Sequence, residues 1–411
     1  MPKSRKDKRG RSLKRGESQR SEDDRYIYTY TDSLGHRRYV YAMDLAELRR
    51  KEQELMRNQL DGLDLYIAER AAVNDAFDRY ISLKQNLRET TRSNYLYTYD
   101  HFVRETFGRK KIGEIRYSDV VRFYNRLLNE KDVSLGTLDA VQCLLHPTFQ
   151  MAVRDNIIRS NPTDGVMAEV KKNSDRTAAV RHALTAAQQR TFMDYVKNHP
   201  VYCRWYPMMT ILLGTGCRIG EAIGLRWEDI DLDNRVISIN HSIVYHPIGE
   251  ERKSEMRVSL PKTEAGIRTI PMLPQVKEAF ELLRAEKEES GANHTVIDGM
   301  TDFVFQNRYG GVPSPQSVNR AIRRITNSYN DQEAEHARRK GREPELLPTF
   351  SAHNLRHTFC TRLCENETNL KVIQAVMGHR DIQTTMNIYA EATEEKKRET
   401  FDMLSAKLDI F

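Results

Sequence analysis

The chain has 411 residues, of which 39% are hydrophobic and 30% are charged, and its formal net charge is +7. This composition is too apolar for an intrinsically disordered protein, and the length suits two or three domains. No apolar run approaches the roughly 20 residues that span a bilayer, so no transmembrane helix is expected. No apolar stretch follows the basic N-terminus, so a secretory signal is not expected either. Because the five cysteines are few and thinly spread, a disulfide-stabilised secreted scaffold is excluded and a cytoplasmic protein is expected.

The excess positive charge lies at the N-terminus. Residues 1–20 carry nine Lys or Arg against Asp7 and Glu17, so nine minus two already equals the net charge of +7. Such a segment attracts polyanions, either nucleic acid or an acidic membrane surface. A solubilising tail has the same composition. We predict a disordered basic arm over residues 1–21.

A small module of strands and one helix is predicted over residues 22–65. Tyrosine-rich alternation at 26–31 and 36–42, separated by an Asp-Ser-Leu-Gly turn, is typical of a hairpin. Asp44 and Glu47 form a capping box for a helix that runs to about residue 58. The tyrosines either pack on this helix or, beside the basic arm, place a sheet in a DNA groove.

The next segment, residues 70–165, is predicted to be a helical bundle. Apolar residues recur there at three- and four-residue spacing, which is the period of an amphipathic helix. The predicted helices cover 73–87, 91–107, 118–128 and 135–157. An Asn-Pro pair at 161–162 ends the bundle, and the aperiodic residues 166–183 are predicted to be a linker.

The rest of the chain is predicted to be an α+β domain over residues 184–392, followed by a tail over 393–411. Thr185 and Gln188 form a capping box at the first helix of this domain. Strands are predicted at 235–240, 256–260 and 267–270. Helices are predicted at 186–198, 202–213, 219–226, 274–289, 315–328, 351–365, 369–377 and 381–388, with an exposed loop or helix extension at 330–346. We therefore expect a multidomain protein that is mainly α-helical with small β-sheets.

Four clusters of residues in this domain could take part in chemistry. Two of them lie in its first half. The glycine-rich turn at 214–221 opens a helix, where the helix N-terminus and the planar fork of Arg218 favour an anion. The alternative is that Arg218 only pairs with Glu221. Lys262 lies near the tip between two predicted strands, where most lysines are merely solvated.

The other two clusters lie near the C-terminus. His353 and Arg356 are three residues apart and share one face of a helix. His379 follows a glycine that breaks the preceding helix. Tyr389 ends a short polar helix, a position where a tyrosine is usually an ordinary surface residue.

A metal site on the helix of His353 is also considered. His357, Cys360 and Cys364 continue the row of His353 at helical spacing. Four ligands in such a row span about 16 Å at 1.5 Å per residue, too far to surround one tetrahedral ion. We interpret the two cysteines as buried apolar residues and expect no metal.

Together, two arginines, two histidines, one lysine and one tyrosine are the groups needed to cleave a phosphodiester without a metal. Arginines neutralise the charge that develops on the phosphate. A phenol, with a pKa of about 10, becomes a nucleophile only with a base and a positive field beside it. The leaving alkoxide needs a proton, which a lysine supplies.

The order of these motifs resembles the tyrosine recombinases, also called the phage integrase family. The stretches that carry the resemblance are 215–221, 262–271, 353–358 and 377–389. The sequence of arm, bundle and catalytic domain is similar to the integrases of conjugative transposons and temperate phages. Nearly the whole chain therefore has a counterpart in such integrases.

The resemblance implies which residues would hold the scissile phosphate. Arg218 and Arg356 would clamp it, and His379 would donate a hydrogen bond to it. Glu221 matches the acidic position after the first arginine and would orient the site.

The resemblance also implies which residues would move the proton and form the new bond. Tyr389 would form a 3′-phosphotyrosyl bond, and His353 would act as its base or as a phosphate donor. Lys262 would protonate the departing 5′ oxygen.

In this family four protomers on two DNA sites exchange strands through a Holliday junction, without ATP. The resemblance thus implies a bacterial, nucleoid-associated recombinase that integrates and excises a mobile element, works as a homotetramer on double-stranded DNA and needs no cofactor. The module at 22–65 would bind arm-type sites, and the bundle would bind core-type sites. An excisionase or a host DNA-bending protein would be a further partner. The tail is expected to dock on a neighbouring protomer, and folding back on its own domain is the alternative.

Two other functions remain open at the level of sequence. A type IB topoisomerase shares the same chemistry and would relax supercoiled DNA without site preference. A non-catalytic DNA-binding regulator would use the basic arm and the bundle and would form no covalent adduct.

Overall fold

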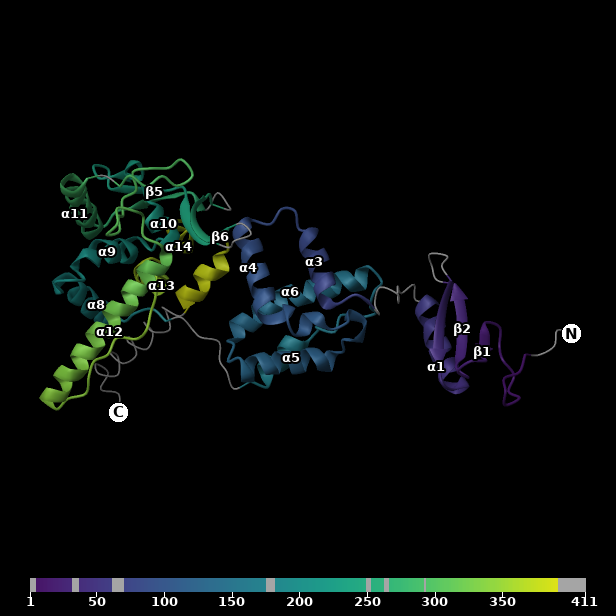
Figure 1. The fold of residues 1–411 in the computed structure, drawn as a ribbon. Helices are drawn as coiled ribbons and strands as arrows, with labels where there is room; N and C mark the ends of the chain where they lie inside the picture. The colour runs from purple at the N-terminus through teal and green to yellow at the C-terminus, as the bar shows by residue number, and fades with distance from the viewer. Residues whose placement is uncertain are drawn as a thin grey trace. The chain divides into compact units, whose positions relative to one another are not determined.

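The computed structural model describes residues 5–31, 37–60, 70–174, 182–248, 253–261, 266–291 and 293–390. The chain divides into two compact units, residues 1–179 and 180–411 (Figure 1). The predicted fold class, mainly helical with small β-sheets, is confirmed, and the sheets are antiparallel. In the part of the chain that is described, every helix is too short or too polar to cross a membrane.

The first unit begins with a three-stranded antiparallel sheet that is covered by one helix (Figure 1). Its elements are β1 (Glu17–Gln19), β2 (Tyr26–Thr31), β3 (Arg37–Ala42) and α1 (Leu45–Leu60). Side chains alternate between the two faces of a strand, so Tyr26 and Tyr28 are buried beside Leu48, whereas Tyr39 and Tyr41 are exposed. The predicted hairpin is present as the β2–β3 pair, and its turn lies outside the described residues.

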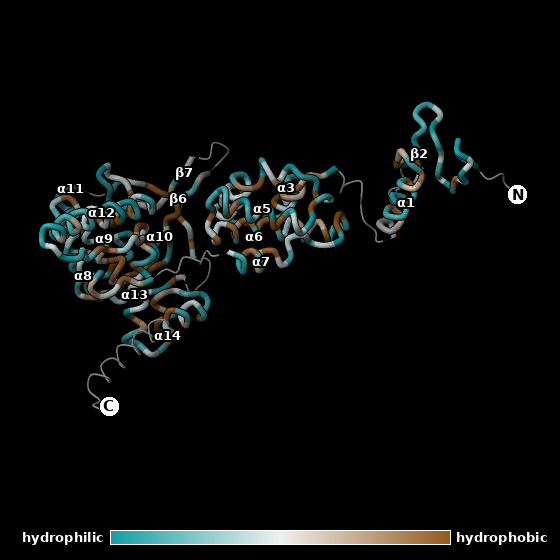
Figure 2. Tube along the Cα trace, turned by 90° about the horizontal axis from the view of Figure 1, so that it is seen from below, coloured by the Kyte–Doolittle hydropathy of each residue, from teal (hydrophilic) through white to brown (hydrophobic). Residues whose placement is uncertain are grey.

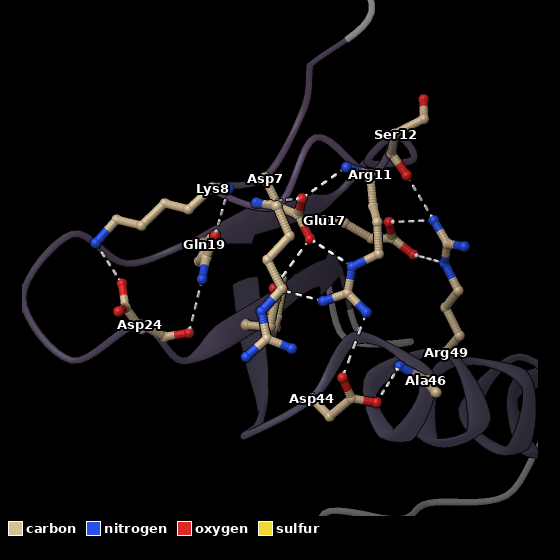
Figure 3. Close-up of polar contacts among 12 residues, drawn as sticks. Asp7, Lys8, Arg11, Ser12, Glu17, Gln19, Asp24, Asp44, Ala46 and Arg49 are labelled. Carbon is tan, nitrogen blue, oxygen red and sulfur yellow. Dashed lines mark hydrogen bonds and ion pairs between the residues drawn. The ribbon is translucent and has the colours of Figure 1, made fainter.

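The segment before this sheet is folded rather than disordered (Figure 3). The Asp7 carboxylate accepts hydrogen bonds from the Arg11 amide at 2.7 Å and from Arg11 Nε at 2.8 Å. Arg49 Nε donates to Glu17 Oε1 at 2.9 Å, and Arg49 Nη2 donates to the Ser12 carbonyl at 2.7 Å. Asp7 also accepts a hydrogen bond from the Tyr26 hydroxyl of β2 at 3.0 Å, so the two acidic residues connect the segment to the sheet and to α1, which a count of charges alone does not reveal. The structure therefore differs here from the predicted disordered arm.

The remainder of the first unit is a helical bundle with its own core. Its α-helices are α3 (Val73–Ser82), α4 (Glu89–Tyr99), α5 (Tyr117–Glu130), α6 (Leu135–Arg154) and α7 (Val166–Lys172). The helix predicted over 91–107 instead changes at Asp100–Arg104 to a π-helical turn. The apolar pattern did not reveal this change, and Val103 and Phe107 are both buried in the observed geometry.

Helix α7 occupies the first part of the predicted linker. Val166 and Val170 are buried against the bundle, and Lys171 pairs with Asp139 at 2.8 Å. A helix of seven residues is too short to show a hydrophobic period in the sequence. The linker prediction is therefore corrected at its start, and residues 175–181 lie outside the described part.

The second unit combines two small sheets with seven α-helices among its described residues. Strands β4 (Ile230–Asp231), β5 (Val236–Ile239) and β8 (Arg268–Pro271) form one antiparallel sheet, and β6 (Ser242–Ile248) and β7 (Lys253–Ser259) form a separate pair. The helices are α8 (Ala186–Asn198), α9 (Tyr206–Thr215), α10 (Ile219–Gly224), α11 (Pro274–Ser290), α12 (Pro315–Lys340), α13 (Ala352–Asn366) and α14 (Leu370–Met377). A further helical stretch covers 382–390. Figure 2 shows hydrophobic and hydrophilic residues interspersed along the chain of this unit, whereas α9 is apolar and buried over most of its length, as expected of a core helix.

Helix α12 continues past the predicted range of 315–328 to Lys340, in keeping with the helix extension that was one of the two alternatives for 330–346. Glu333 on its second half accepts hydrogen bonds from Arg342 Nη1 at 2.6 Å and from the Glu345 amide at 3.0 Å. Asn330 both donates to and accepts from the backbone of Leu347, at 2.9 and 2.8 Å. Polar bonds to the returning chain thus hold this half of the helix, and they leave no apolar pattern in the sequence.

Candidate active site

Arg218 lies at the junction between α9 and α10. Helix α9 ends at Gly216, whose left-handed φ of 63° turns the chain. The Glu221 carboxylate then caps α10 by accepting from the Arg218 amide at 2.9 Å, and it also accepts from Arg218 Nη1 at 2.7 Å. The Arg218 side chain nevertheless remains 44% exposed. The ion pair and an anion-binding role are therefore compatible.

Arg356 is buried within α13 and is held by two backbone carbonyls. Its Nη1 donates to Gly216 and its Nη2 donates to Met377, both at 2.6 Å. Burial and the nearby Arg218 lower the pKa of Arg356 to about 10. The guanidinium therefore remains charged at neutral pH and, through Gly216, is fixed to the same turn that carries Arg218.

Glu221 has a second arginine partner that sequence reasoning missed. Arg268 on β8 donates from Nη2 to Glu221 Oε2 at 2.8 Å and from Nη1 to Oε1 at 3.2 Å. Burial would raise the pKa of Glu221, but the hydrogen bonds and charge of Arg268, together with Arg218, hold it at about 2. Arg268 stands in the motif stretch 262–271, but its partner is distant in sequence, so spacing alone gave no signal.

His379 lies directly after α14, beyond the left-handed Gly378, and is buried. Its Nδ1 lies 3.0 Å from the hydroxyl oxygen of the fully buried Thr385, a second partner that the sequence did not reveal. Burial, and then the charges of Arg356, Arg218, Arg268 and His353, lower the pKa of His379 to about 4. The imidazole is therefore neutral at pH 7 and lies in the field of these residues.

Of the remaining predicted site residues, the structure describes His353 and Tyr389 but not Lys262. His353 is exposed near the start of α13. Tyr389 is half-buried and packs on the cluster that contains Cys360, Cys364 and Met377. Both cysteines are buried, as predicted. Lys262 lies outside the described residues. Among the residues that are described, no group of three His, Cys, Asp or Glu side chains is placed to hold a metal ion.

The lowered pKa of His379 predicts how the second unit responds to acid. Because the folded pKa of about 4 lies below the ordinary value of 6.5, the unfolded chain takes up the proton first as the pH falls. Stability is therefore lost between pH 6.5 and 4, by up to about 3 kcal/mol at roughly 1.4 kcal/mol per unit. Denaturant titrations followed by fluorescence of Trp205 and Trp227, both in this unit, should show a smaller loss for His379→Asn. An equal loss in the variant would contradict the assignment.

Gly216 is expected to be intolerant of a side chain. Its φ is left-handed, and a Cβ there would collide with the Phe359 ring. Gly216→Ala should destabilise the second unit by about 2 to 3 kcal/mol. Gly341 has a nearly equal φ of 65° and open space around it, so Gly341→Ala isolates the backbone strain, at about 1 kcal/mol. Equal losses in thermal or denaturant unfolding would show that the collision is relieved.

Three family models together match most of the chain. The phage integrase family matches residues 182–396. The DNA-binding domain of the Tn916 integrase matches residues 1–59, and the N-terminal SAM-like domain of phage integrases matches residues 73–128. All five predicted site residues that the structure describes lie within the first match: Arg218, His353, Arg356, His379 and Tyr389.

Relatives with curated descriptions and solved structures agree with these matches. The transposase of transposon Tn916 from Enterococcus faecalis is 30% identical over 96% of this chain and 95% of its own. The transposase of Tn1545 from Streptococcus pneumoniae is 29% identical over the same shares. The Tn1549 transposon integrase, solved with transposon right end DNA, is 30% identical with a TM-score of 0.68 and covers 81% of this chain and 99% of its own. The lambda integrase dimer on a core site shares the fold alone, at 17% identity and a TM-score of 0.52 over 92% of this chain and 95% of its own.

Proposed function

Because the chain belongs to the phage integrase family and is a site-specific tyrosine recombinase of mobile elements, we propose that it cuts and rejoins double-stranded DNA through a bond between Tyr389 and a 3′ phosphate. The observation that carries the proposal is the gathering of Arg218, Arg356 and His379 around the end of α14. This arrangement supplies positive charge and a neutral donor at one place, as an in-line phosphoryl transfer requires.

The two arginines are proposed to hold the scissile phosphate. Among the residues that the structure describes, each guanidinium donates two of its N–H groups to the protein, out of five available donors. The remaining donors, including Nε, are left to bind non-bridging phosphate oxygens. Their combined charge opposes the negative charge that grows on the phosphate as the tyrosine attacks.

His379 is proposed to donate a third hydrogen bond to the phosphate. An imidazole that is neutral carries one N–H, and the partner of the other nitrogen decides where it is. If the Thr385 hydroxyl donates to Nδ1, the proton resides on Nε2, which then donates to a phosphate oxygen. Neutral His379 thus supplies a donor without adding a third positive charge.

The covalent step is proposed to proceed as follows. The Tyr389 oxygen forms a bond to phosphorus while the bond from phosphorus to the 5′ oxygen breaks. His353 accepts the phenol proton, and Lys262 donates a proton to the departing 5′ oxygen. Attack by a 5′ hydroxyl of the exchanged strand reverses these transfers, so the energy of the phosphodiester is conserved and no ATP is needed.

The other parts of the chain are proposed to supply DNA contacts and assembly. The module at 22–65 is proposed to bind arm-type sites and the bundle at 70–165 to bind core-type sites, in keeping with the matched domain models. We further propose a homotetramer at the bacterial nucleoid, with the tail 393–411 docked on a neighbouring protomer. An excisionase or a DNA-bending host protein would assist excision.

The proposal is tested with a nicked duplex that carries an end of the element. Cleavage beside the nick releases a short strand and should leave a covalent protein–DNA adduct with a free 5′ hydroxyl. Duplexes of scrambled sequence serve as the control. Relaxation of plasmid lacking the element's end would point to a topoisomerase, and binding without any adduct would point to a DNA-binding regulator.

Thr385→Val should slow cleavage about tenfold, as the loss of a partner that orients a catalytic group typically does. The variant keeps the shape of the side chain but removes the hydroxyl beside His379 Nδ1, so the proton is free to leave Nε2. The exposed neighbour provides the control Thr384→Val. Single-turnover cleavage at saturating protein measures the effect, and a rate equal to that of the control would rule out this role for Thr385.

A further inference from the structure

Three consecutive carbonyls at the end of α14 each accept a hydrogen bond from a different arginine. Arg268 Nε donates to Val376 at 2.8 Å, Arg356 Nη2 donates to Met377 at 2.6 Å, and Arg218 Nη2 donates to Gly378 at 3.0 Å. The last carbonyls of a helix have no partner within it and lie at its negative end, so they suit cations. The end of α14 therefore joins β8, α13 and the start of α10.

Arg268 differs from the other two arginines because the protein itself occupies its guanidinium. Beyond the bond to Val376, its Nη1 donates to Glu221 at 3.2 Å and to Gly266 at 3.4 Å, and its Nη2 donates to Glu221 at 2.8 Å. These bonds use four of the five donors. The Arg268 side chain is only 5% exposed, against 44% for Arg218. Arg356 is also buried, so Arg268 differs from it by the number of occupied donors and by its carboxylate partner.

We propose that Arg268 is a positioning residue of the recombination reaction, which sets Arg218 through Glu221 and His379 through the end of α14. The proposal rests on the phosphate-binding roles proposed above for Arg218 and His379. Glu221 is the connecting group, because it binds the amide and Nη1 of Arg218 on one side and the fork of Arg268 on the other. Val376 lies three residues before His379. The hydrogen bond that anchors the Val376 carbonyl therefore also helps to fix the backbone that carries the His379 side chain.

The connection through Glu221 predicts that the rate of cleavage depends differently on pH when Arg268 is replaced. The charged groups that face Glu221 are Arg218, Arg268 and Arg356, and the Cys217 thiol is also nearby. Without Arg268, the buried Glu221 carboxylate loses its largest favourable partner, and its pKa rises. Protonated Glu221 no longer orients Arg218, so cleavage should fall as the pH is lowered.

The experiment compares Arg268→Gln, Glu221→Gln and the double variant with Arg257→Gln, whose parent residue pairs with Asp298 on the surface of the same unit. DNA affinity, thermal stability and single-turnover cleavage of the nicked duplex are measured from pH 5 to 8. We expect Arg268→Gln to bind DNA within a few-fold of the parent and to cleave about 10- to 100-fold more slowly at pH 7, with a further loss toward pH 5. The double variant should lack this further loss, and at pH 5, where Glu221 is protonated in Arg268→Gln, it should cleave no more slowly than that single variant.

Two results would overturn the inference. The first is a cleavage rate of Arg268→Gln equal to that of the control. The second is a loss of cleavage rate in Arg268→Gln that is the same at every pH and that adds fully to the loss caused by Glu221→Gln when the two substitutions are combined. If Arg268→Gln does not fold, Arg268→Lys keeps the charge but lacks the fork. It should still cleave more slowly than the control at pH 7, with a smaller further loss toward pH 5, and cleavage equal to that of the control would overturn the inference. Arg218→Lys separates the two proposals. If it slows cleavage while Arg268 variants do not, only the positioning role fails; if it too has no effect, the proposed phosphate site fails.

Discussion

Replacement of Tyr389 by Phe is expected to abolish the covalent protein–DNA adduct while leaving DNA affinity unchanged. The substitution removes only the phenolic oxygen, and the ring can still pack on the cluster formed by Cys360, Cys364 and Met377. Loss of an essential nucleophile should reduce cleavage by about 10⁴-fold or more. Denaturing gels of the nicked duplex after incubation with the variant measure the adduct directly.

Tyr309 provides the matched control for this experiment. It lies in the same unit and its side chain is largely exposed, so Tyr309→Phe also removes a phenolic oxygen without affecting the proposed site. The control should form the adduct at the parental rate. An adduct that survives Tyr389→Phe would place the nucleophile on another residue.

Arg218→Lys is expected to keep DNA binding within a few-fold and to slow cleavage by about 10²- to 10³-fold, or roughly 3 to 4 kcal/mol. A lysine retains the positive charge, but its ammonium cannot bind Glu221, the Gly378 carbonyl and a phosphate oxygen at fixed angles as the planar guanidinium does. Binding is maintained because most of the affinity for DNA comes from many other phosphate contacts. Rapid-quench measurements at saturating protein separate the cleavage rate from binding.

Arg190 gives the corresponding control. It is exposed on α8, and its Nε donates to the Ala186 carbonyl of its own helix, so Arg190→Lys should cleave DNA as fast as the parent. Equal rates for Arg218→Lys and Arg190→Lys would remove Arg218 from the proposed phosphate site.

The parts of the site that the sequence predicted are those in which chemistry dictates the type of residue. Arg218, Arg356 and His379 stand in short motifs whose order identified them, and the structure places them around one helix end. Arg268 and Thr385 were missed because their roles depend on contacts across elements. A buried arginine on a strand requires a carboxylate partner, and that requirement is the signal that pointed to Arg268 once its burial was known.

Local pattern also explains which parts of the fold were predicted. Strong periodicity located most helices, whereas the short α7 and the second half of α12 have little apolar pattern. Helix α7 is fixed by the core of the bundle and by Asp139, and the second half of α12 by the chain that returns directly after it. The folded segment at 5–21 shows the same limitation. Its arginines signalled disorder by composition, yet Asp7 accepts a hydrogen bond from Tyr26 of the sheet and Glu17 binds Arg49 of α1.

Mapping the bond between protein and DNA tests the central claim most directly. The adduct formed on the nicked duplex is digested with protease and nuclease, and mass spectrometry identifies the residue and the DNA end that are joined. We predict a single modified peptide that contains Tyr389, linked through a 3′ phosphate, with a free 5′ hydroxyl on the released strand. Attachment to any other residue, or to a 5′ phosphate, would contradict the account.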